Sequence, residues 1–142
     1  YSMNQTQTDE TYMSFAIRMS QNSKAERAKV GAVLVTTDEV ILAGYNGTPR
    51  GADNVAEMYS DGELVTKPDV LHAELNCIMK AARQGVSCKD ATVYVTLSPC
   101  VHCAAMLVQI GIKRLVYMRK YRDTSGIDYL ENHNIIVEEY YV

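Results

Sequence analysis

Residues 92–110, TVYVTLSPCVHCAAMLVQI, contain the strand-to-helix transition around which we expect this chain to fold. Residues 92–97 are rich in β-branched and aromatic side chains, which predicts a strand, and residues 100–110 are predicted to form a helix. Ser98 is a natural N-cap for that helix, and Pro99 suits its first position, where a missing N–H costs nothing. A strand that leads directly into a helix is typical of α/β domains.

The segments on both sides of this stretch continue the alternation of helices and strands. After an opening hairpin, helix, strand, helix, strand, helix and strand follow one another, which predicts parallel strands joined by right-handed crossovers. The predicted elements, in chain order, are helix 8–22, strands 30–35 and 39–44, helix 72–83, strand 92–97, helix 100–110, strand 114–118, helix 125–132 and strand 135–140.

We therefore expect a three-layer α/β/α domain around a mixed five-stranded sheet, with an antiparallel hairpin turning at Thr37-Asp38 and parallel later strands. The length of 142 residues leaves room for one domain, 1–142. Residues 1–2 precede Met3 and are interpreted as an addition before the native start. Thr8 is the predicted N-cap of the first helix. Residues 45–71 lack periodicity and are predicted to be a long functional loop.

Composition restricts the possible partners. The net charge is −3, and acidic residues are frequent in the loop from 52 to 70, whereas polynucleotide-binding proteins usually present a basic face. No apolar run approaches the ~20 residues of a membrane span, and no secretory signal opens the chain. We therefore expect a cytoplasmic protein with a small substrate, no polynucleotide partner, no membrane partner and no disulfides among its four cysteines.

The chemistry begins with Cys100 and Cys103, which are three residues apart at the start of a predicted helix. The positive end of the helix dipole favours thiolates, the form that binds metal. His72 starts another predicted helix and supplies a third ligand, which together with an open position for water is typical of catalytic zinc. Glu74 follows closely and is the predicted catalytic proton shuttle between that water and a substrate.

Each of these residues has an ordinary structural interpretation when it is taken alone. A closed structural zinc site would need a fourth ligand, and the nearby candidate, His102, is predicted to be a solvated helix residue. Cys77 is predicted to be a small buried hydrophobe, and Cys88 is given no role. The combination of H-x-E with P-C-x-x-C is far more specific, because it is the signature of zinc-dependent nucleobase deaminases.

Four segments extend the resemblance beyond the zinc motif: KVGAVLV at 29–35, GYNGTPRG at 44–51, HAELN at 72–76 and YVTLSPC at 94–100. They resemble the deoxycytidylate (dCMP) deaminases of the cytidine deaminase superfamily, over about residues 11–140. The resemblance implies hydrolytic deamination of dCMP to dUMP and ammonia, which supplies thymidylate synthesis. It implies that zinc-activated water attacks C4 while Glu74 protonates N3 and then the leaving amine. It also implies a homohexamer, activated by dCTP with Mg²⁺ and inhibited by dTTP.

The resemblance further implies which residues contact nucleotides. Arg27 and Tyr121 are candidates for the phosphate and sugar, whereas Lys120 and Arg122 are interpreted as solvated charges. Asn46 and Gly47 resemble a nucleotide-contacting turn. Many such enzymes hold a second, structural zinc, but residues 4–71 contain neither Cys nor His, so one catalytic zinc is expected. The substrate-binding candidates are Arg27, Asn46, Ala73, Ser98 and Tyr121, and the effector-binding candidates are Tyr45, Asn46, Gly47 and Arg83.

Other functions remain open at this point. The chain could deaminate a different base, such as adenosine in tRNA, free cytosine or guanine, although a tRNA enzyme should carry a basic surface. A non-catalytic nucleotide sensor could keep the zinc for stability, but it would have no use for Glu74 as a proton shuttle. A third alternative is that the chain is a structural interaction module, and the feature that favours it is the tyrosine-rich tail, residues 138–142.

Overall fold

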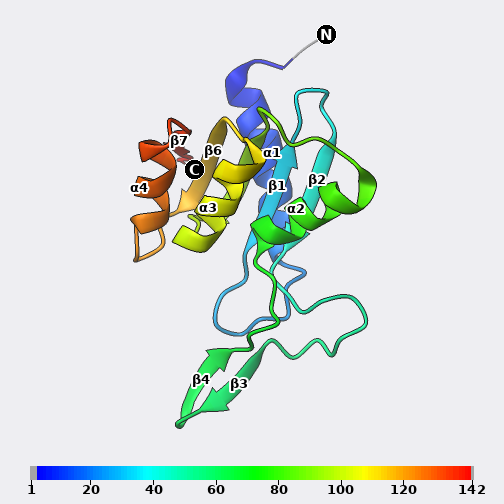
Figure 1. The fold of residues 1–142 in the computed structure, drawn as a ribbon, viewed down its shortest axis with the longest axis vertical. Coiled ribbons are helices and arrows are strands. Elements are labelled where there is room, and N and C mark those ends of the chain that lie inside the picture. Colours follow the sequence, from blue (N-terminus) through cyan, green and yellow to red (C-terminus); the bar gives the residue numbers. More distant parts are fainter. Residues whose placement is uncertain (1–2, 142) are drawn as a thin grey trace.

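The structure, a computed structural model, describes residues 3–141; the predicted addition at residues 1 and 2 lies outside them. A layered α/β body carries a small hairpin that projects from one end (Figure 1). The elements are α1 (Gln5–Ser20), β1 (Gly31–Val35), β2 (Ile41–Tyr45), β3 (Glu57–Ser60), β4 (Glu63–Thr66), α2 (Ala73–Gln84), β5 (Thr92–Leu97), α3 (Val101–Ile110), β6 (Arg114–Arg119), α4 (Ser125–Asn132) and β7 (Ile136–Glu139).

The main sheet has five strands in the order β2-β1-β5-β6-β7. β1 is antiparallel to both β2 and β5, whereas β5, β6 and β7 run parallel. Side chains of α1 pack on one face of the sheet against Val33, Tyr94 and Val116. Side chains of α2, α3 and α4 pack on the other face, around Leu34, Val93, Leu115 and their neighbours. The predicted three-layer fold with a mixed five-stranded sheet is therefore confirmed.

The start of the first helix differs from the prediction. Asn4, not Thr8, is the N-cap: its side chain accepts a hydrogen bond from the Gln7 N–H, and the Gln7 side chain accepts one from the Asn4 N–H. This reciprocal capping box starts the helix at Gln5. The prediction failed because it followed the apolar stripe, and the first turn of the helix is polar and largely exposed.

The cap of α3 also differs from the prediction. Cys100 occupies the N-cap position and the helix begins at Val101, so Ser98 is not the cap. The Ser98 hydroxyl instead accepts a hydrogen bond of 2.7 Å from the backbone N–H of Tyr121. The Ser98 oxygen, which was predicted to cap α3, therefore binds the segment that follows β6.

The segment from residue 45 to 71 was predicted to be a loop without regular structure, and this prediction is wrong in part. The segment contains the β3–β4 hairpin. The tip is Asp61-Gly62, and both residues have positive φ, 51° and 80°, as in a type I′ turn. Most side chains of the hairpin are exposed or half-buried, so no apolar alternation reveals the strands in the sequence.

Candidate active site

The first residues of α2 and α3 meet at the carboxyl edge of the parallel strands. His72 is the N-cap of α2, with extended backbone angles. Cys100 is the N-cap of α3, three residues after β5 ends, and Cys103 lies on the first turn. A Cβ on Gly126 in α4 would lie 2.0 Å from the Pro99 carbonyl oxygen, so the absence of a side chain lets α4 pack against the loop that carries Cys100.

The three predicted ligands come together in space. The His72 Nδ1 atom lies 3.2 Å from Cys103 Sγ and 3.7 Å from Cys100 Sγ, and all three ligand atoms lie within 4.8 Å of one another. Tetrahedral zinc with ordinary Zn–N and Zn–S bond lengths separates nitrogen from sulfur by about 3.6 Å. One imidazole and two thiols of this spacing fit zinc, and no reorganisation of the backbone is needed.

Electrostatics at this cluster favour a thiolate at Cys100. Hydrogen bonds with the Cys103 and His72 side chains and with the Cys103 N–H lower the pKa of Cys100 to about 3. The same hydrogen bond to Cys100, together with burial, raises the pKa of Cys103, and the hydrogen bond to Cys100 raises the pKa of His72. Binding of a metal cation to the cluster would therefore release the protons that its ligands still carry.

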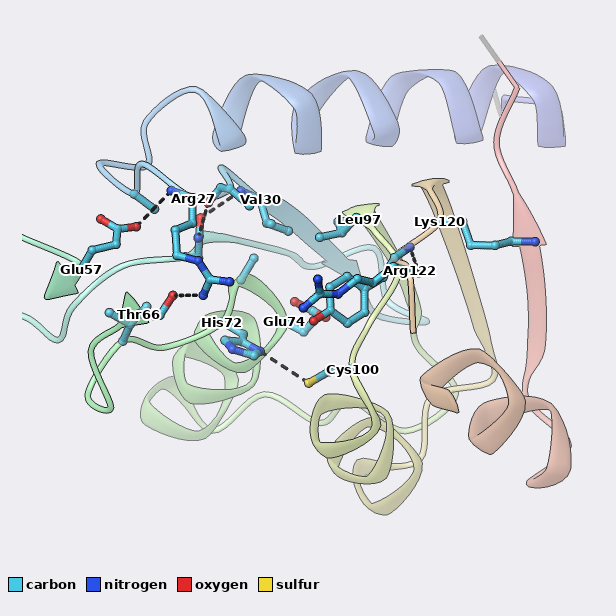
Figure 2. Close-up of a pocket in the computed structure, with 17 residues that line it drawn as sticks. Arg27, Val30, Glu57, Thr66, His72, Glu74, Leu97, Cys100, Lys120 and Arg122 are labelled. Carbon is cyan, nitrogen blue, oxygen red and sulfur yellow. Dashed lines mark hydrogen bonds between the residues drawn. The ribbon is translucent and has the colours of Figure 1, made fainter. Parts of the chain in front are cut away.

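Glu74 lies on the first turn of α2 and is 4% exposed. Burial raises the pKa of its carboxyl group to about 7. Figure 2 shows the carboxyl group next to His72 and Cys100, on the wall of a cavity. A carboxyl group with a pKa near neutrality can both take up and release a proton, as a general acid–base requires.

The cavity beside this cluster has a volume of about 460 Å³. Arg27 lines it on one side, and Lys120 and Arg122, which follow β6, line it on the other (Figure 2). The sequence predicts that Lys120 and Arg122 are solvated charges, and both side chains are exposed. The Arg122 side chain nevertheless reaches over the cavity, whereas the Lys120 side chain extends away from His72. The residues predicted to bind substrate, Arg27, Asn46, Ala73, Ser98 and Tyr121, all line this cavity.

The side chains of two of these residues bond to backbone groups of the chain. The Asn46 side chain accepts a hydrogen bond from the Val30 N–H at 2.9 Å and donates one to the Ala28 carbonyl at 2.8 Å. Ser98 accepts from the Tyr121 N–H, as described above. Asn46 and Ser98 therefore hold the walls of the cavity in place, and direct contact of either with a substrate stays a prediction.

The predicted effector residues behave differently. Tyr45, Gly47 and Arg83 do not line the cavity, and only Asn46 of that set does. Gly47 pairs with Leu71 through two backbone hydrogen bonds of 3.0 and 2.8 Å, so the Asn46-Gly47 pair enters a β-bridge and does not form a tight turn. An effector role for these residues stays a prediction.

Other predictions about single residues are confirmed. His102 is exposed and lies outside the metal-ligating group, and Cys77 is 1% exposed within the core. Glu57 and Thr66 also line the cavity, from the β3–β4 hairpin, and are not among the site residues predicted from the sequence. No motif marks them, because they reach the site only through the fold of a segment that looked like a loop.

An α/β/α sandwich with a His-Cys-Cys group, a buried glutamate and an adjoining cavity defines the class of zinc-dependent deaminases. Residues 6–119 match the family model described as the cytidine and deoxycytidylate deaminase zinc-binding region. The chain belongs to this family, which confirms the predicted class of enzyme and its zinc-binding domain.

Named relatives agree with this assignment. The chain is similar to the dCMP deaminase of cyanophage S-TIM5, crystallised with dCMP and dUMP, at 40% identity and a TM-score of 0.88, covering 98% of this chain and all of that one. It is 36% identical to the deoxycytidylate deaminase of Enterobacteria phage T4, over 78% of this chain and 77% of the relative. It is 39% identical to the human deoxycytidylate deaminase, over 82% of this chain and 67% of the relative.

Proposed function

We propose that this chain hydrolyses dCMP to dUMP and ammonia. The observation that carries the proposal is that His72 and Cys100 of the metal-ligating cluster line one cavity together with Glu74 and with cationic side chains on opposite walls (Figure 2). The cavity, of about 460 Å³, leaves room for a cytosine base beside the cluster, and a monophosphate would be neutralised by Arg27 and Arg122. The phage and human relatives named above, which bear the name of this activity, support the same substrate.

The residues suggest how the reaction would proceed. Zinc held by His72, Cys100 and Cys103 would lower the pKa of a water molecule and so supply the nucleophile. Glu74 would accept a proton from the attacking water as a bond forms between the water oxygen and C4 of the cytosine. Glu74 would then donate this proton to N3, take up a second proton from the hydroxyl group formed on C4, and donate it to the amino group, which leaves as ammonia as its bond to C4 breaks. Burial of Glu74 keeps bulk water away from these transfers.

The test is an ammonia-release panel with dCMP, CMP, deoxycytidine and cytosine as substrates, together with a tRNA stem-loop. We expect dCMP to react with a higher kcat/KM than deoxycytidine and cytosine, because the cationic walls of the cavity attract the phosphate that these two compounds lack. Equal rates on dCMP and tRNA, or no reaction with dCMP, would contradict the proposal. A non-catalytic nucleotide sensor would release ammonia from none of these substrates.

Regulation and assembly form a separate proposal, supported by the family resemblance. We propose a homohexamer that dCTP activates with Mg²⁺ and dTTP inhibits, with Tyr45, Asn46, Gly47 and Arg83 contacting the effector. Sigmoidal dCMP kinetics that dCTP makes hyperbolic would support it, and a lack of response to both nucleotides would contradict it. Sedimentation analysis measures the assembly.

The cellular role is likewise proposed and not observed. The resemblance supports a cytoplasmic enzyme that supplies dUMP for thymidylate synthesis. Among residues 3–141, no helix combines the length and apolar character that crossing a membrane requires. Fractionation of the source cells, followed by the ammonia assay, tests the location.

A further inference from the structure

Glu57 is a buried acidic residue on a hairpin that is otherwise mostly exposed. It is the first residue of β3 and is 7% exposed, whereas the other three residues of that strand are exposed. Its Oε2 atom accepts hydrogen bonds from the backbone N–H groups of Glu26, at 2.9 Å, and Arg27, at 3.2 Å. Hydrogen bonds to an ionised carboxylate are about twice as strong as those between neutral groups. Glu57 therefore ties the projecting hairpin to the segment that precedes β1.

Thr66 holds the same arginine from the opposite strand. It lies across the hairpin from Glu57, and its Oγ1 atom accepts a hydrogen bond of 3.1 Å from Nη1 of Arg27. Figure 2 shows Glu57 bonded to the backbone of this segment and Thr66 bonded to the guanidinium of Arg27. The cross-strand pair thus restrains both ends of a residue whose side chain has several rotatable bonds.

We propose that Glu57 is a positioning residue, which fixes the Arg27 guanidinium at the cavity wall and thereby determines the affinity for substrates that carry a phosphate. Part of this inference rests on the proposed function, because it assigns the phosphate to Arg27. The Glu57 carboxylate acts through Arg27: its Oε2 is occupied by two backbone donors, and its negative charge would repel a phosphate. Preorganisation of this kind lowers the entropy cost of binding.

The test compares Glu57→Gln with Glu63→Gln, which makes the same change of charge at an exposed position of the same hairpin. We expect Glu57→Gln to raise KM for dCMP about tenfold, which corresponds to one charge-assisted hydrogen bond, and to leave kcat within about twofold. KM for deoxycytidine, which has no phosphate, should not change. Glu63→Gln should behave like the unmodified chain. A fall in kcat with KM unchanged, or an equal rise in KM for dCMP and deoxycytidine, would overturn the proposal.

A double-mutant cycle separates positioning from direct contact with substrate. If Glu57 acts through Arg27, Glu57→Gln should have no further effect on KM for dCMP in an Arg27→Gln background. Additive effects of the two substitutions would show that Glu57 contacts substrate independently, and would overturn the proposal. If Glu57→Gln lowers the melting temperature below the assay range, Thr66→Val tests the side-chain restraint: a higher KM for dCMP is expected, and an unchanged KM would count against the proposal.

Amide hydrogen exchange makes failure of this inference distinguishable from failure of the proposed function. The N–H groups of Glu26 and Arg27 should exchange faster in Glu57→Gln than in Glu63→Gln, whatever the substrate is. If exchange is unchanged, Glu57 does not hold the segment and the inference is wrong, even if the chain deaminates dCMP. If exchange accelerates but the chain releases no ammonia from dCMP, the proposed function fails while the anchoring role of Glu57 holds.

Discussion

At the scale of single residues, burial gives ordinary side chains their chemistry. Glu74 is an acidic residue near a helix N-terminus, a place where the dipole alone would favour the charged form. Its 4% exposure reverses this preference and raises the pKa of its carboxyl group to about 7. Cys100 shows the opposite effect, since hydrogen bonds hold its pKa at about 3. Two groups that line the same cavity are thus prepared for proton transfer and for metal binding.

The first prediction concerns Glu74→Gln. We expect kcat for deamination to fall by about 10²- to 10⁴-fold, because the glutamine amide has nearly the same shape as the carboxyl group but cannot carry the proton. Bound zinc, measured by atomic absorption, should stay near one ion per chain, since the ligating atoms are unchanged. His102→Gln is the control and should keep both activity and zinc, because His102 is exposed and lies outside the cluster. Full activity of Glu74→Gln would remove Glu74 from the mechanism.

At the scale of elements, α1 is attached to the sheet by one polar cluster as well as by apolar packing. Asp9 accepts two hydrogen bonds from the Arg114 guanidinium, at 2.9 and 2.8 Å, and one of 2.7 Å from the Tyr94 hydroxyl. Burial of Asp9 raises its pKa, but the hydrogen bonds from Arg114, Tyr94 and Gln5 outweigh this effect and lower it below 3.8. Arg114 also pairs with Glu138 on β7. One arginine therefore connects a helix and two strands.

The second prediction is that Asp9→Asn lowers the free energy of unfolding by about 1–3 kcal/mol at pH 7, because Arg114 loses a charged, bidentate partner. The folded-state pKa of Asp9 lies below its unfolded value, so the stabilisation is complete above the unfolded pKa and is lost as the pH falls through the folded pKa. Urea unfolding at pH 7 and pH 3 should show the difference between the two chains shrinking at pH 3. Glu10→Gln, at an exposed neighbouring position, should change stability by less than about 0.5 kcal/mol.

At the scale of the whole molecule, the metal-ligating cluster joins parts of the chain that are distant in sequence. His72 opens α2, and Cys100 and Cys103 lie at the start of α3. α4 packs against the loop before Cys100, and the 119–122 segment is tied to Ser98. A ligand that binds only the folded chain stabilises it by mass action. Zinc should therefore stabilise the entire domain and not only the site.

The third prediction is that chelation of zinc lowers the melting temperature by on the order of 10 °C, as expected for a ligand present at about 1,000 times its dissociation constant. Differential scanning calorimetry with and without a chelator measures the shift, and added zinc should restore it. Cys103→Ser is the matched control, because a chain that lacks one thiolate should bind zinc weakly and respond little to the chelator. A chelator shift of equal size in both chains would show that zinc does not act through this cluster.

The sequence by itself determined the chemistry and the class of fold. H-x-E and P-C-x-x-C are local motifs, so the sequence alone reveals the metal ligands and the acidic residue beside them. Short-range periodicity reveals the alternation of helices and strands, and the preferred handedness of crossovers then favours a layered sheet. What the tertiary structure decided is how other side chains are used. Ser98 supports Tyr121 instead of capping α3, and Glu57 and Thr66 hold Arg27 from a hairpin without apolar alternation. Such hydrogen bonds join residues 23 to 39 positions apart, and no local pattern encodes a partner that only the folded chain brings near.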